Sequence, residues 1–80
     1  MMMQKAVYLE WDDSCSDSGW TNDEKIKTFL RPWVIKSIGY IVGENKTHIA
    51  ITTSIGQGGN KMDVLTIPKA CISKRRVLKI

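Results

Sequence analysis

The sequence has few of the residues that build metal or disulfide sites. Its two cysteines, Cys15 and Cys71, are widely separated and have no CxxC spacing, and His48 is the single histidine. These residues are too few for a four-ligand zinc site. Without a secretory signal, two cysteines are expected to remain reduced thiols. We therefore expect no metal and no cofactor.

Long apolar runs are also missing. None approaches the roughly 20 residues that a membrane-spanning helix needs. Residues 1–3 are methionines that lead directly into Gln4 and Lys5, with no extended apolar core or small-residue cleavage site. The sequence therefore predicts a protein without a signal peptide or membrane association, located in the cytoplasm.

What is present is an ordinary globular composition. The chain has 80 residues and a mass of 9.1 kDa, of which 42% of residues are hydrophobic and 25% charged. This composition excludes intrinsic disorder as the default state. A chain of this length forms one small domain, residues 1–80, with a thin core.

Charge is unevenly distributed along the chain. Residues 1–24 sum to −5, whereas residues 61–80 sum to +5, and the whole chain carries +4. The acidic beginning and the basic end either pair in the fold, form separate surfaces for partners, or remain solvated.

The first element predicted is a half-buried strand over residues 5–11. Val7, Leu9 and Trp11 alternate with residues of the other face, including Tyr8. A polar loop over residues 12–19 follows. Thr21 and Glu24 have capping-box spacing and Pro32 prevents continuation, so we expect a short helix over about residues 22–30.

The rest of the chain has the character of a sheet. Residues 33–42 are rich in β-branched and aromatic side chains, with a bend expected at Gly39. Further strands are expected at 47–55 and 62–67, with edge pieces at 70–72 and 77–80. About five short antiparallel strands and one helix predict a mainly β fold, a small SH3-like or Sm-like barrel.

Two segments resemble parts of Sm-type barrels. Residues 37–51 are similar to the glycine, turn and alternating apolar unit that begins such a barrel, and residues 66–74 are similar to the strand pair that closes it. Sm proteins place their helix before the first strand, whereas here a strand precedes the helix. The resemblance implies the same small-barrel architecture.

A wider resemblance is to a group of small proteins encoded in tailed-phage and prophage genomes. The shared outline is Trp-x-Asp, Gly-Trp, Ile-Gly-Tyr and Ile-Pro-Lys, which here are residues 11–13, 19–20, 38–40 and 67–69. The resemblance implies an accessory protein of phage origin, expressed in the cytoplasm of a bacterial host.

Catalysis is not expected. His48 lies within a predicted strand beside a turn, with no nucleophile and acid in a recognisable arrangement, so we interpret it as a surface or sheet-face residue. We expect a non-enzymatic binding module.

Nucleic acid is the first partner that the sequence suggests, because clustered cations near the end of the chain can displace counterions from phosphates. The candidate nucleic-acid-binding residues are Lys69, Lys74, Arg75, Arg76 and Lys79. An exposed Tyr40 or Trp33 is a candidate for stacking on a base.

A protein partner in the host is the alternative. Trp20 either packs against the start of the helix or is an exposed interface anchor, and acidic residues precede it. The candidate protein-binding residues are Trp20, Asp12, Asp13 and Asp17. A third hypothesis is sequestration of a small nucleotide signal, and open edge strands suggest a homo-oligomer.

Overall fold

The computed structural model describes residues 4–14 and 19–79, and Asp17 and Cys15 lie outside the described residues. The fold is mainly β, with a five-stranded antiparallel sheet and one short helix, as the sequence predicts. No helix in the described part of the chain is long and apolar enough to cross a membrane. The elements are β1 (Ala6–Asp12), α1 (Asp23–Phe29), β2 (Val34–Glu44), β3 (His48–Thr52), β4 (Ser54–Ile55), β5 (Lys61–Met62), β6 (Leu65–Pro68), the 3-10 turn η1 (Lys69–Cys71) and β7 (Ile72–Leu78).

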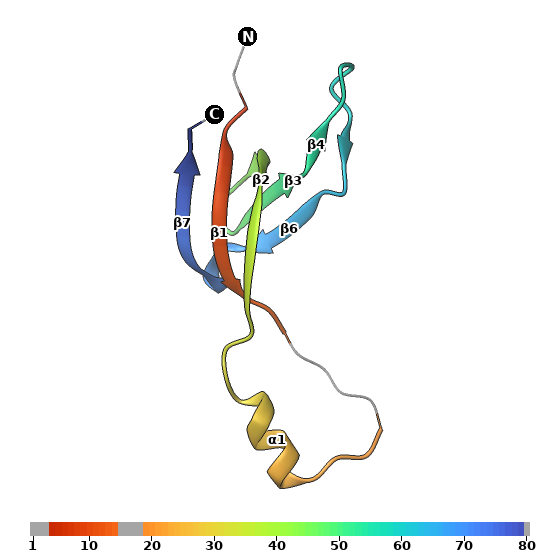
Figure 1. The fold of residues 1–80 in the computed structure, drawn as a ribbon, viewed down its shortest axis with the longest axis vertical. Helices are drawn as coiled ribbons and strands as arrows, with labels where there is room; N and C mark the ends of the chain where they lie inside the picture. The colour runs from red at the N-terminus through yellow and green to blue at the C-terminus, as the bar shows by residue number, and fades with distance from the viewer. Residues whose placement is uncertain (1–3, 15–18, 80) are drawn as a thin grey trace.

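The sheet has the strand order β6-β3-β2-β1-β7, and β4 and β5 form a separate two-stranded ribbon. Its edge strands, β6 and β7, are consecutive in the chain and are joined only by η1 (Figure 1). The sheet therefore curls back on itself, as the strands of a small barrel do. In the described residues no backbone ladder links β6 to β7.

The curl depends on a bend in β2. From Val34 to Tyr40 this strand pairs with β1, and from Tyr40 to Glu44 it pairs with β3. A Cβ added at Gly39 would lie 2.8 Å from the carbonyl oxygen of Thr52 and 3.2 Å from Cβ of Ile51. The register with β1 is regular through Gly39, and the irregularity of β2 lies further on, between Ile41 and Gly43. At Gly39, where the sequence predicts a bend, the structure shows the close approach of β3, which leaves no room for a side chain.

The core lies on the inner face of the bend. Val7 and Leu9 from β1 meet Ile49 and Ile51 from β3 and Ile67 from β6, and all are buried. Trp11 packs against this cluster at its margin, and its indole Nε1 donates a hydrogen bond to Ser37 Oγ over 3.1 Å. The alternation predicted for residues 5–11 is therefore the alternation observed.

Strand boundaries differ from the predictions at three places. The segment predicted at 47–55 divides into β3 and β4, and Ile55 belongs to the ribbon rather than to the core face. The segment at 62–67 is interrupted at Asp63, whose φ of 54° breaks extended structure. The end pieces predicted at 70–72 and 77–80 are instead η1 and one continuous strand, β7.

The helix matches its predicted range within a residue at each end, but its cap is different. Asn22, rather than Thr21, is the N-cap, because its Oδ1 accepts a hydrogen bond from the backbone N–H of Lys25. The capping box predicted between Thr21 and Glu24 is therefore wrong: Lys25, not a Glu or Gln, stands three residues after the N-cap, and Glu24 pairs with Lys27 instead.

Candidate nucleic-acid interface

Strand β7 distributes the basic end of the chain over two faces of the sheet. Side chains alternate along a strand. Arg75 lies opposite the buried Leu9 and so belongs to the inner side, whereas Lys74 and Arg76 lie opposite Glu10 and Tyr8 on the outer side. The candidate cations that are contiguous in sequence are therefore not one patch.

Arg75 and Lys69 both form ion pairs with Glu44, at the end of β2. One carboxylate oxygen lies 2.8 Å from Arg75 Nη1 and 2.7 Å from Lys69 Nζ, and the other accepts from Arg75 Nη2 over 3.0 Å. The hydrogen bonds from Arg75 and then Lys69 lower the pKa of Glu44 from its ordinary value to about 2. Glu44 therefore links β2 to η1 and β7, which makes this ion-pair cluster a fastening for the curled sheet.

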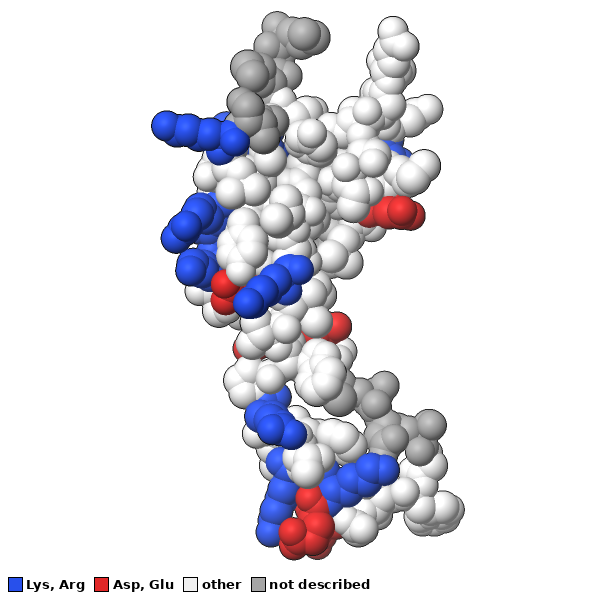
Figure 2. Space-filling view, in the orientation of Figure 1, with Lys and Arg blue, Asp and Glu red and all other residues white. Residues whose placement is uncertain are grey.

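The outer cations lie on what we call the outer face, the exposed side of β7, β1 and β2. In one row across these strands Lys74, Glu10 and Lys36 are neighbours, and in the next row Arg76, Tyr8 and Ile38 are neighbours. Lys and Arg side chains follow β7 and extend over the adjoining part of the sheet (Figure 2). In the described part of the chain no carboxylate forms an ion pair with Lys36, Lys74 or Arg76.

Tyr8 occupies the middle of the outer face. Its hydroxyl donates a hydrogen bond to Glu10, and this bond, more than its partial desolvation, raises the pKa of Tyr8 above the ordinary value. The ring is thereby fixed, neutral and half-buried between Arg76 on β7 and the exposed Ile38 on β2. Such an arrangement offers a flat aromatic surface flanked by cations.

Two residues that complete this face are not indicated by the sequence. Lys36 and Ile38 belong to β2, about 40 positions before the basic segment, and only the register of three strands brings them together. The sequence did contain one signal for this face. Side chains alternate along the strand predicted at residues 5–11, so Tyr8 is expected on the side opposite the core. Lys79, the first residue after β7, is exposed. Of the two aromatics predicted to stack, Tyr40 is half-buried, as Tyr8 is, and lies in the row of the outer face after Ile38, opposite Ala6. Trp33 is exposed beside the helix rather than on the outer face.

Those candidate protein-binding residues that the structure describes, Trp20, Asp12 and Asp13, lie at the other end of the molecule. Trp20 is fully exposed and does not pack against the helix, so the interpretation as a helix staple is wrong for this structure. Asp12 and Asp13 are exposed where the chain leaves β1, and the backbone N–H of Asp13 donates to the carbonyl of Trp33.

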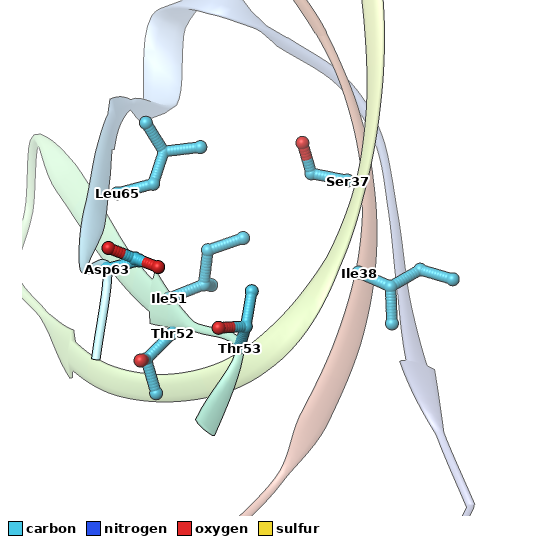
Figure 3. Close-up of a pocket in the computed structure, with 7 residues that line it drawn as sticks. All are labelled: Ser37, Ile38, Ile51, Thr52, Thr53, Asp63 and Leu65. Carbon is cyan, nitrogen blue, oxygen red and sulfur yellow. The ribbon is translucent and has the colours of Figure 1, made fainter. Parts of the chain in front are cut away.

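A groove opens where the two halves of the bent sheet diverge. It has a volume of about 240 Å³, and Ser37, Ile51 and Leu65 border it, while Ile38 points away from it (Figure 3). Its one charged lining residue is Asp63, and no Lys or Arg lines it. A nucleotide phosphate would find no cation there, so this groove gives no support to nucleotide sequestration.

His48 is exposed on β3, as predicted for a sheet-face residue. Its Nδ1 lies 2.8 Å from the hydroxyl of its neighbour Thr47. This contact organises the turn before β3, where Asn45 Oδ1 also accepts from the backbone N–H groups of Thr47 and His48.

Comparison of the chain with protein-family models, with curated proteins and with solved structures finds no match.

Proposed function

We propose that the chain is a phage or prophage accessory protein that binds single-stranded nucleic acid through its outer face. The phage assignment depends on the four spaced motifs described above. The binding assignment depends on one observation, the placement of Lys36, Lys74 and Arg76 around the ring of Tyr8 on an exposed sheet face.

Each part of the face has a task in this proposal. The three cations approach backbone phosphates and release condensed counterions, which gives an attraction independent of sequence. The ring of Tyr8 stacks on a base, and the outer side of the curled sheet presents it without a groove that would restrict access. The negative charge of Glu10 reduces the local attraction for phosphate, but its carboxylate also holds the Tyr8 side chain in position by accepting a hydrogen bond from the hydroxyl.

The test compares two double charge reversals. Binding of a labelled single-stranded oligonucleotide of about ten nucleotides is followed by fluorescence anisotropy at about 50 mM salt. Lys74→Glu with Arg76→Glu should weaken binding about 100-fold, because two favourable phosphate contacts become repulsive. Lys46→Glu with Lys61→Glu changes the net charge equally on exposed turn and ribbon positions, and should weaken binding less than about 5-fold.

Two single variants separate the outer face from the basic tail. Lys36→Glu should weaken binding about 10-fold although Lys36 is distant from the tail in sequence. Tyr8→Ala should also lower the affinity for the oligonucleotide about 10-fold, whereas Tyr8→Phe should retain most of the affinity because the ring remains. Absence of binding by the unmodified protein, or equal losses in both double variants, would refute the proposal.

A further inference from the structure

The helix and its flanking residues form an arm that projects away from the sheet (Figure 1). We define the arm as residues 19–33, which include α1. Trp20 is fully exposed, Leu30 is 78% exposed, Trp33 55% and Ile26 40%. In the described residues the substantial contacts between elements all join strands, and no residue of α1 is buried. Within the described residues, the apolar side chains of the arm therefore do not belong to the core, and Trp20 and Leu30 are the most exposed of them.

Local signals define this helix but do not stabilise it sufficiently. The Asn22 cap and the acidic residues Asp23 and Glu24 favour its first turn. A helix of seven residues is nevertheless unstable in water without tertiary packing. Ordering the first turn costs more conformational free energy than its few hydrogen bonds recover. A stable helix at this place requires something to cover Ile26 and Leu30.

The area left exposed indicates the size of the covering surface. The chain exposes 6643 Å², whereas a compact protein of 9.1 kDa exposes about 4,900 Å². Its radius of gyration is 16.1 Å, against about 12 Å for a compact domain of 80 residues. The surplus of about 1,700 Å² per chain exceeds the roughly 800 Å² that each partner buries in a standard protein interface. The surplus belongs to the whole chain, which also exposes Met62, Val64 and Val77 outside the arm, so it allows a contact of standard size without placing all of that area on the arm.

The charges of the arm suit a second copy of the same arm. Asp23 and Glu24 lie at the start of α1, while Lys27 and Arg31 lie at its end and just beyond it. If two arms pair antiparallel, the acidic start of each lies beside the basic end of the other, and the two helix dipoles also oppose. A two-fold pair of this kind uses the same surface on both chains.

We propose that the arm is a self-association surface, in which two copies pair their arms antiparallel and bury Trp20, Ile26, Leu30 and Trp33 between them. The outer face lies on the sheet, outside this contact, so a dimer would present two outer faces. This inference is independent of the proposed nucleic-acid binding.

The first test is the mass of the unmodified protein in solution, measured by light scattering at about 100 μM, well above the Kd of about 1 μM expected for an interface of this size. A dimer, twice the 9.1 kDa of the chain, is expected. Ile26→Glu with Leu30→Glu should give the monomer mass with an unchanged thermal midpoint for the sheet, because neither side chain contributes to the core. Met62→Glu, a similar change on the exposed side of the ribbon, should leave the dimer intact. A monomeric unmodified protein, including one whose arm binds a different protein, would overturn the inference.

The second test identifies the partner as another arm. One chain carries Asp23→Lys and Glu24→Lys, which makes its arm basic, and another carries Lys27→Glu and Arg31→Glu, which makes its arm acidic. Each alone should be monomeric or associate at least 10-fold more weakly, and an equimolar mixture should form the heterodimer. Failure of the mixture to associate while the unmodified protein dimerises would place the contact outside the arms.

Discussion

Replacing Gly39 by valine lowers the free energy of unfolding by about 3–4 kcal/mol, the cost of overpacking a dense site with a branched side chain. The reason is steric, because even a Cβ at this position would lie 2.8 Å from the Thr52 carbonyl oxygen, and that oxygen belongs to the backbone of β3. β3 would have to move away from β2, which would open the core cluster around Ile51. Since small domains are stable by only about 5–15 kcal/mol, the variant should unfold at a much lower urea concentration, measured by circular dichroism.

Gly43→Ala supplies the matched control. Gly43 lies in the same strand, and a Cβ there would meet its nearest neighbour, Ala50 Cβ, at an ordinary 3.8 Å. This variant should stay within about 0.5 kcal/mol of the unmodified protein. Gly39→Ala, which adds only the Cβ, should already cost more than Gly43→Ala. Equal effects of these two alanine substitutions would show that β2 and β3 do not approach closely at Gly39.

Glu44→Lys should lower the free energy of unfolding by about 2–3 kcal/mol, because it removes a two-pronged contact with Arg75 and sets three cations together. The carboxylate is partly exposed, at 31%, so solvent screens part of the interaction and keeps the loss in this range. Glu44→Gln should cost about 1 kcal/mol, since it retains the shape but not the charge. Urea unfolding at neutral pH measures both losses.

The pH dependence gives the same interaction an independent signature. Because the pKa of Glu44 is lowered in the folded state to about 2 from 4.5, its contribution is complete above pH 4.5 and is lost as the pH falls toward 2. The difference in stability between the unmodified protein and Glu44→Gln should therefore be constant above pH 5 and shrink between about pH 4.5 and 2. A difference that does not change with pH would contradict the role of the ion pairs.

The sequence predicted those parts of the fold in which one local pattern controls the outcome. Val7, Leu9 and Trp11 alternate and face the core, and Gly39 lies where β3 approaches β2 too closely for a side chain. In both cases the physical cause, burial of one strand face or lack of space for a Cβ, acts within a few residues. The mainly β class followed from these elements.

The candidate site was less accessible to sequence reasoning. The segment from Ser73 to Arg76 contains no β-branched or aromatic residue, so its extension into β7 depends on pairing with β1 rather than on its own propensity. Once it is a strand, alternation separates Arg75 from its neighbours, and Lys36 joins them from β2. Register between distant strands is a tertiary property, and a basic run alone does not reveal it.

The arm shows the same limit. The range of the helix was predicted within a residue of each end, because the signals for its start and for its end before Pro32 are local, although Asn22 and not the predicted Thr21 is the N-cap. Whether Trp20 packs on the helix start or faces solvent depends on the path of the chain around it, and the sequence left both outcomes open.

The most direct measurement of the proposed function is a nuclear magnetic resonance titration of isotope-labelled protein with a single-stranded oligonucleotide. The account predicts that the largest shifts of backbone amide signals fall on the outer face, at Tyr8, Lys36, Ile38, Lys74 and Arg76, with little change at Arg75 or in the groove beside Leu65. Shifts concentrated on the arm, in the groove or around the Glu44 cluster, or no shifts at all, would contradict it.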